Sequence, residues 1–228
     1  MMVNIEEWLP RWRCAVEEVF GQRIRLLGLQ GSYRRGEAVE GRDIDVVLIL
    51  DKVEMADLKR YRAVLDGLPH REKICGFVGG AEELRHWEPA DLFQFREDTQ
   101  PLSGDLDSLL PPFCPGDVKR AVWTGACGIY HLCGREFLHQ NEPEGRTATL
   151  RSLYKSVVFV MQALGMDRTG QYCRRREELR QTLTAEEGLL LDIAEQLKGG
   201  TELTEQEEEA AFSRLLQWSG QLIRSYGV

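Results

Sequence analysis

The chain has 228 residues, enough for one large domain or two modest ones with a sizeable hydrophobic core. Hydrophobic residues make up 43% and charged residues 29%, which excludes a disordered or fibrous protein. The net charge of -8 argues against a broad basic surface, so we expect no binding to nucleic acid. It favours a small anionic substrate whose charge is masked by a metal ion.

The N-terminus and the cysteines indicate the compartment. The first ten residues, MMVNIEEWLP, are acidic where a secretory peptide is basic, and no later run reaches the roughly 18 apolar residues of a membrane span. We therefore expect a cytoplasmic protein without membrane contact. The cysteines form no CxxC pair, which argues against a zinc knuckle or a disulfide framework and predicts free, mostly buried thiols at Cys14, Cys75, Cys114, Cys127, Cys133 and Cys173.

Helices and strands alternate in the first hundred residues. Residues 4–22 predict an amphipathic helix with a capping box, because Asn4 is followed three residues later by Glu7. Residues 43–50, DIDVVLIL, predict a strand that is buried on both faces beyond its first residues. The remaining elements are strands at 23–30, 72–80 and 89–98 and a helix at 55–69. This alternation predicts a sheet covered by helices.

A proline-rich segment, LLPPFCPGD at 109–117, is the best candidate for a domain boundary, and strand patterns fade after it. Residues 146–165 carry apolar side chains along one helical stripe, and two later helices begin with capping boxes at Thr184 and Thr204. We therefore expect an α+β chain, with a mixed-sheet domain over residues 1–112 and an all-α helical bundle over residues 113–228.

The residues around the first turn carry the chemistry. Asp43 and Asp45 are two apart in a strand, so their side chains share a face, where the two charges repel unless a cation binds them. Mg²⁺ typically takes one or two carboxylates and completes its shell with water and phosphates. Gly31 lets the backbone approach a phosphate closely, and Ser32 supplies a hydroxyl and a helix N-cap. Arg35 and the arginine before it could add charge-assisted hydrogen bonds.

Each of these residues also has a simpler interpretation. Gly31 and Ser32 could form only a turn, the arginines could be solvated, and Asp43 could cap the strand or pair with Arg42. Because the turn, the spacing and the paired aspartates occur in order between two strands, we favour a nucleotide and metal site.

The stretch GSYRRGEAVEGRDIDVVLIL at 31–50 resembles the DNA polymerase β-like nucleotidyltransferase superfamily. In that superfamily a Gly-Ser turn, often continued by Arg-Gly, is followed about a dozen residues later by Asp-x-Asp on the next strand. Position 42, often Ser in the motif, is Arg here. The resemblance implies a polymerase β-like palm domain at residues 1–112, and the helical remainder is similar to that of bacterial antibiotic nucleotidyltransferases and minimal nucleotidyltransferases.

The resemblance also implies the roles of individual residues. Gly31 and Ser32 would hold the triphosphate of an NTP co-substrate such as ATP, and Asp43 and Asp45 would bind two Mg²⁺ ions. A third carboxylate on a later strand usually completes the metal site and can take the proton of the attacking hydroxyl. We assign this role to Asp91, which lies in an apolar segment.

Asp98 is the alternative third carboxylate, and Asp91 could instead be a helix cap or a strand-edge residue after Pro89. Lys155 could reach the triphosphate if its helix flanks the cleft, as a lysine does in some relatives, or it could be a solvated surface residue. The predicted catalytic and metal-binding residues are thus Asp43, Asp45 and Asp91, and the predicted nucleotide-binding residues are Gly31, Ser32, Arg35 and Lys155.

The implied reaction is transfer of a nucleoside monophosphate from an NTP to an acceptor hydroxyl by a two-metal in-line displacement that releases pyrophosphate. A small acceptor such as an antibiotic is favoured, because acidic walls suit cationic molecules. Two alternatives stay open: an enzyme that transfers AMP to a protein, as an antitoxin does to its toxin, and a nucleotide-binding module with little turnover. The sequence does not fix the preferred base or the oligomeric state.

Overall fold

The computed structural model describes residues 2–139 and 143–227. These residues belong to two compact units, Met1–Pro112 and Phe113–Val228. The division lies within the proline-rich segment at 109–117, and each unit has its own set of buried apolar side chains.

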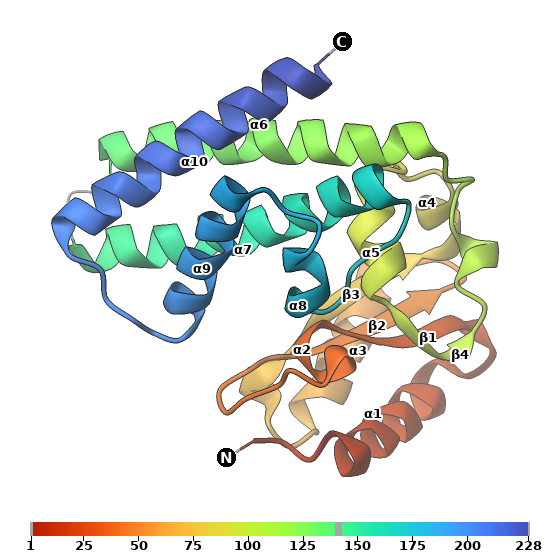
Figure 1. Cartoon of the computed structure of the whole chain (residues 1–228). Coiled ribbons are helices and arrows are strands. Elements are labelled where there is room, and N and C mark those ends of the chain that lie inside the picture. Colours follow the sequence, from red (N-terminus) through yellow and green to blue (C-terminus); the bar gives the residue numbers. More distant parts are fainter. Residues whose placement is uncertain (1, 140–142, 228) are drawn as a thin grey trace. The chain divides into compact units, whose positions relative to one another are not determined.

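The first unit is built on a four-stranded mixed sheet (Figure 1). Its strands are β1 (Ile24–Gln30), β2 (Ile44–Leu50), β3 (Ile74–Gly80) and β4 (Gln100–Gly104). They lie in the order β3-β2-β1-β4, with β1 antiparallel to both β2 and β4 and β2 parallel to β3. The mixed sheet predicted from the sequence is confirmed. The helices of this unit are α1 (Ile5–Phe20), α2 (Gly31–Arg35), α3 (Met55–Asp66), α4 (Ala81–Arg85) and α5 (Leu92–Asp98), with short 3-10 turns η1 (Gly21–Arg23), η2 (Arg71–Lys73) and η3 (Asp107–Leu109).

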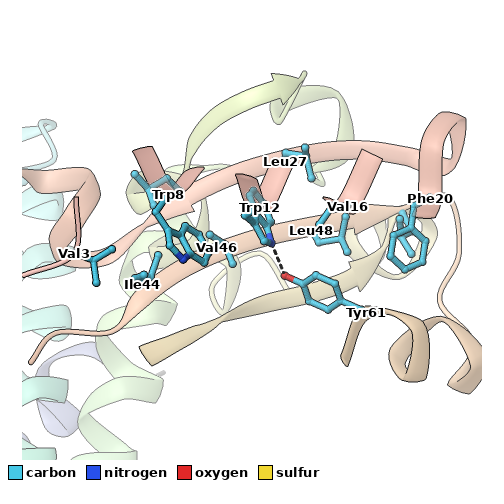
Figure 2. Packing of buried hydrophobic residues seen from close by; sticks show 12 residues of the cluster. Val3, Trp8, Trp12, Val16, Phe20, Leu27, Ile44, Val46, Leu48 and Tyr61 are labelled. Carbon is cyan, nitrogen blue, oxygen red and sulfur yellow. Dashed lines mark hydrogen bonds between the residues drawn. The ribbon is translucent and has the colours of Figure 1, made fainter. Parts of the chain in front are cut away.

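Helices α1 and α3 cover one face of the sheet. The buried residues of α1 recur every four residues, at Trp8, Trp12, Val16 and Phe20, and this apolar stripe packs on β1 and β2. Figure 2 shows the indole N–H of Trp12 pointing at the hydroxyl of Tyr61 on α3, to which it donates a hydrogen bond of 3.1 Å. Both side chains are buried, so this bond satisfies a donor that would otherwise be costly and ties α1 to α3.

Helices α4 and α5 and the turn η3 cover the opposite face. Val47 and Ile49 of β2 pack there, whereas Val46 and Leu48 pack on the α1 face. Successive residues of β2 are therefore buried on both faces, as predicted. The same alternation places Asp45 on the α5 face, at the end where β2 begins.

The predicted strand at 89–98 is wrong, because α5 occupies residues 92–98 and the strand of this region is β4. Leu92, Phe93 and Phe95 are all buried, and Leu92 and Phe95 are three apart, which suits one side of a helix. A run this short fits a helical and a strand period equally well, so the apolar pattern could not decide between them.

The predicted capping box at Asn4 does not form. The Asn4 side chain donates to Glu7 Oε1 at 2.7 Å and makes no cap bond to the backbone. Asn4 and Glu7 thus bond to each other and not to the backbone, so the first turn of α1 lacks the predicted side-chain cap.

The second unit is all-helical, as predicted. It contains α6 (Pro115–His139), α7 (Pro143–Thr169), α8 (Arg176–Arg180), α9 (Ala185–Lys198) and α10 (Glu205–Tyr226). Helix α6 packs against α7 and α10, and α7 also packs against α9. The predicted capping boxes are confirmed, because Thr184 and Thr204 each accept a hydrogen bond from the backbone N–H three residues on. Over the residues that the structure describes, no helix combines the length and apolar character needed to cross a bilayer.

The cysteines are free, as predicted, but the expectation that most are buried is wrong. Only Cys133 is buried, whereas Cys14, Cys75 and Cys114 are exposed. Burial raises the pKa of the Cys133 thiol to about 11, which makes it unreactive.

Candidate active site

The turn after β1 lies against the start of β2. The antiparallel register pairs Gln30 with Asp45, so Gly31 leaves the strand directly beside the Asp45 carboxylate. A Cβ atom at Gly31 would lie 2.0 Å from Asp45 Oδ2, and Gly31 has a φ of +71°, which L side chains rarely adopt. The backbone approaches this carboxylate so closely that only a glycine fits.

Ser32 is the second residue of α2. The prediction that Ser32 is the N-cap of a helix is therefore wrong. The helix begins at Gly31, and its N-cap position is Gln30, which makes no side-chain cap bond. Ser32 therefore lies in the first turn, where backbone N–H groups have no acceptor within the helix. The Ser32 hydroxyl and these N–H groups therefore belong to the first turn of α2, which begins at Gly31 beside Asp45.

Asp43 and Asp45 lie at the open end of β2. Asp43 is exposed and comes two residues before Asp45, which is half-buried. Ile44 between them is buried on the α1 face, so side-chain alternation assigns Asp45 to the opposite face. Asp43 precedes the first residue of β2, and its place on the same face stays a prediction. Two carboxylates placed in this way would make a ligand pair for a hard divalent cation.

Arg35, which the sequence predicted to bind nucleotide, is paired with Asp98 at the C-terminal end of α5. Arg35 Nη1 lies 2.7 Å from Oδ1 and 2.6 Å from Oδ2 of Asp98, and Arg35 Nε lies 3.4 Å from Glu37 Oε2. Burial lowers the pKa of the Arg35 guanidinium, but the hydrogen bond to Asp98 and the nearby carboxylate charges outweigh burial, so its pKa is raised. Asp98 also accepts a hydrogen bond of 3.1 Å from the backbone N–H of Gly31. The structure thus brings Gly31 and Asp45 together with Arg35 and Asp98.

Asp91 lies elsewhere on α5. It is exposed at the N-cap position of the helix and makes no side-chain cap bond. Asp98 is the last residue of α5, seven positions on, so the two residues lie at opposite ends of a helix about 10 Å long. The strand on which the choice of Asp91 was based does not exist, and Asp98 is the carboxylate at the Gly31 end.

The sequence interpretation missed Cys75, which is the residue of β3 paired with Asp45. The parallel register between β2 and β3 aligns these two residues, and Cys75 is exposed. Gly76, the next residue, has a φ of +135°, and a Cβ atom there would lie 1.9 Å from the carbonyl oxygen of Val46. This close approach fixes β3 against β2 beside Asp45. Only the register reveals Cys75, because no local motif marks it.

In the described residues, no third carboxylate forms a metal-binding group with Asp43 and Asp45. Within residues 2–139 and 143–227, no group of three or more His, Cys, Asp or Glu side chains could hold a metal ion. Lys155, the remaining predicted site residue, is exposed on α7 in the second unit. The site defined by the first unit therefore consists of the Gly31 turn, Asp43, Asp45 and the Arg35–Asp98 pair, with Cys75 beside Asp45.

Residues 13–101 match the family model of the nucleotidyltransferase domain, and this segment contains every residue of the site in the first unit. No curated protein matches the chain. Among solved structures, the fold is similar to the crystal structure of spectinomycin adenyltransferase AAD(9) from Enterococcus faecialis with ATP and spectinomycin. The TM-score is 0.60 at 13% sequence identity, over 96% of this chain and 99% of that chain. Residues 13–101 are therefore a nucleotidyltransferase domain of the DNA polymerase β-like type, and the protein is a transferase.

Proposed function

We propose that the protein is a Mg²⁺-dependent enzyme that transfers a nucleoside monophosphate from an NTP to a hydroxyl of a small molecule. The observation that carries this proposal is the register between β1 and β2, which sets the Gly31 backbone against Asp45. The first turn of α2, which begins beside Asp45, is suited to a phosphate chain that is neutralised by a divalent cation.

The donor set fits Mg²⁺. Asp43 and Asp45 supply oxygen ligands only, and Mg²⁺ usually binds through one or two carboxylates, with the rest of its shell from water and substrate phosphates. When bound, the cation would neutralise charge that develops on the phosphates during transfer. Gly31 approaches Asp45 so closely that a side chain at position 31 would meet the carboxylate that is proposed to bind the cation.

The residues of the chain would act chiefly by binding and orienting the triphosphate. The Ser32 hydroxyl and the amides that follow Gly31 would donate hydrogen bonds to phosphate oxygens, which aligns the α-phosphorus with the acceptor. The acceptor oxygen forms a bond to that phosphorus and gives up its proton to water, while the bond from the phosphorus to the oxygen that bridges it to the β-phosphate breaks. The products are the nucleotidylated acceptor and pyrophosphate. The roles predicted for Asp91 and Lys155 stay predictions, because no contact described above supports them.

A small-molecule acceptor is favoured by two observations. The similar solved structure is that of an adenyltransferase with ATP and spectinomycin, and the likeness covers 96% of this chain. The net charge of -8 also favours a cationic acceptor over a polyanion such as nucleic acid. We propose an antibiotic of the spectinomycin or aminoglycoside class, with ATP as the donor.

A second candidate is a nucleotide-binding module with little turnover. The residue that pairs with Asp45 on the parallel strand β3 favours this candidate. That residue is Cys75, so this position of a later strand does not supply the expected third carboxylate. With Asp43 and Asp45 as metal ligands and Asp98 held by Arg35, the protein could bind MgATP and still transfer slowly, because none of the three is left to remove the proton from the acceptor hydroxyl.

The test is a pyrophosphate-release screen with the four NTPs and a panel of acceptors, with and without Mg²⁺. The panel contains spectinomycin, aminoglycosides, lincosamides and, for the protein-modifying alternative, cell protein probed with radioactive ATP. We expect Mg²⁺-dependent release that falls at least about 100-fold in Asp43→Asn and Asp45→Asn. Binding of MgATP without pyrophosphate for any acceptor would favour the second candidate, and unchanged turnover in both variants would contradict the proposal.

A further inference from the structure

Asp98 is almost fully buried, and each of its carboxylate oxygens has a protein donor. Both oxygens accept a hydrogen bond from Arg35 Nη1, and Oδ2 also accepts one from the Gly31 N–H. The side chain of Asp98 is 11% exposed and that of Arg35 is 19% exposed, so the pair is largely removed from water. A buried ion pair of this kind becomes strongly unfavourable when one partner is removed, because the other charge is left without compensation.

The position of Asp98 on α5 opposes its charge. It is the last residue of the helix, where the backbone carbonyls make the helix end negative and a carboxylate is disfavoured. Removing a charged carboxylate from water adds a desolvation cost. The Arg35 guanidinium and the Gly31 amide offset both effects, so the carboxylate is stable at this site only through its contacts with α2.

Gly31 is held between two carboxylates. Its backbone N–H donates to Asp98, and a Cβ atom at this position would lie 2.0 Å from Asp45 Oδ2. The absence of a Cβ lets the backbone at position 31 lie against Asp45, and the bond from its N–H to Asp98 holds the start of α2 in that place. Asp98 therefore fixes the phosphate-binding turn beside the predicted metal ligand.

Thr99, the residue after Asp98, provides a second connection between the end of α5 and β1. Gln30 Nε2 donates to Thr99 Oγ1 at 2.6 Å, and the Thr99 hydroxyl donates to the Phe95 carbonyl at 2.5 Å. The methyl group of Thr99 also lies against Gly28, where a Cβ atom would come within 2.9 Å of it. The end of α5 and the end of β1 are thus joined by two consecutive residues on each side.

We propose that Asp98 is a positioning residue for nucleotide binding and not the third metal ligand. It acts through Arg35 and the Gly31 amide, and it holds α2 at the separation from Asp45 that a Mg²⁺-bound triphosphate requires. This inference rests on the proposed function. It gives Arg35 an indirect role in nucleotide binding, because its guanidinium holds Asp98.

The experiment is a double-mutant cycle for MgATP binding, measured by calorimetry on the full chain with Asp98→Asn, Arg35→Ala and the double variant. Arg35→Lys tests rescue, since a lysine keeps one charge-assisted bond to Asp98. Asp57→Asn is the matched control, because Asp57 is also a buried carboxylate paired with an arginine, Arg23, in the same unit. Amide hydrogen exchange of residues 30–36 is measured on the same variants without nucleotide.

We expect each single variant to weaken MgATP binding roughly tenfold or more, and the double variant to be no weaker than the worse single variant. Arg35→Lys recovers most of the affinity, Asp57→Asn keeps it, and the half-saturating Mg²⁺ concentration stays unchanged. Exchange of residues 30–36 becomes faster in Asp98→Asn and not in Asp57→Asn.

Three results would overturn the proposal. Additive losses with an increased Mg²⁺ requirement would make Asp98 a metal ligand. A loss in Arg35→Ala together with equal or tighter binding in Asp98→Asn would mean that Arg35 contacts the phosphates directly. Unchanged exchange in Asp98→Asn would show that Asp98 does not hold α2. If the parent protein binds no MgATP, the proposed function fails, and the exchange measurement alone decides whether Asp98 holds α2.

Discussion

Two buried aspartate–arginine pairs lie at opposite ends of the same sheet. At one end, Arg23 precedes β1 and pairs with Asp57 through contacts of 2.7 and 3.0 Å. At the other end, Arg35 follows β1 and pairs with Asp98 at 2.6 and 2.7 Å. The register between β1 and β2, from Ile24 and Leu50 to Gln30 and Asp45, places the two pairs at the two ends of these strands.

The surroundings of the two pairs differ. Arg23 also binds Asp51 and the Lys52 carbonyl, and Asp57 accepts the Glu54 N–H in the capping box of α3, so this network joins only structural elements. The Asp98 pair instead holds a turn that lies against Asp45. The same ion-pair chemistry therefore joins structural elements at one end and, in our proposal, sets the geometry of a ligand site at the other.

The largest expected effect is a difference between the two glycines at the ends of α2, Gly31 at its first position and Gly36 at its C-cap. Gly31→Ala should weaken MgATP binding roughly 100-fold, because the new Cβ would meet Asp45 Oδ2 at 2.0 Å and displace the turn. Gly36→Ala is the control, since Gly36 also has a positive φ, of 69°, but a Cβ there meets nothing within 4 Å. Calorimetry with MgATP checks both variants. Equal losses of affinity would mean that the contact with Asp45 is unimportant.

The next effect concerns the opposite face of the sheet. Tyr61→Phe should lower the free energy of unfolding by about 1–3 kcal/mol, because the buried Trp12 N–H loses its acceptor, while MgATP affinity stays unchanged. Tyr130→Phe at an exposed position of α6 should change stability by less than about 0.5 kcal/mol. Denaturant unfolding measures both variants, and an altered affinity in Tyr61→Phe would show that the two faces are coupled.

The sequence predicted the closeness of Gly31 and Asp45, because their contact is local. The stretch 31–50 encodes a turn between two strands, so Gly31 and Asp45 could be placed from spacing alone. The Arg35–Asp98 pair joins residues 63 positions apart, and no local pattern indicates such a contact. The pairing of Cys75 with Asp45 likewise depends on strand register, which tertiary packing decides.

A smaller effect is the acid dependence of the structural pair. The hydrogen bond from Arg23 lowers the pKa of Asp57 from 3.8 to about 2. Because the folded value lies below the unfolded one, the ionised carboxylate contributes stability above pH 3.8, and this contribution is lost as the pH falls toward 2. Asp57→Asn should remove this part of the acid dependence. Melting temperatures measured through this range check the prediction, which fails if the parent and the variant lose stability in parallel.

The smallest expected effect compares two exposed thiols of the first unit. MgATP should slow alkylation of Cys75 several-fold, because Cys75 pairs with Asp45 in the sheet, and should leave Cys14 on α1 unchanged. Mass spectrometry after brief treatment with N-ethylmaleimide measures both rates in one sample. Equal protection of both thiols, or of neither, would argue against a ligand beside Asp45.

The most direct measurement is calorimetric binding of ATP to the parent protein, Asp43→Asn and Asp45→Asn, each with Mg²⁺ and with EDTA. Asp57→Asn again controls for the loss of a carboxylate in the same unit. We predict that the parent binds ATP only with Mg²⁺, that both site variants lose this binding, and that Asp57→Asn retains it. Binding that is absent in the parent, or equal in the parent and both site variants, would contradict a nucleotide and metal site at the Gly31 turn.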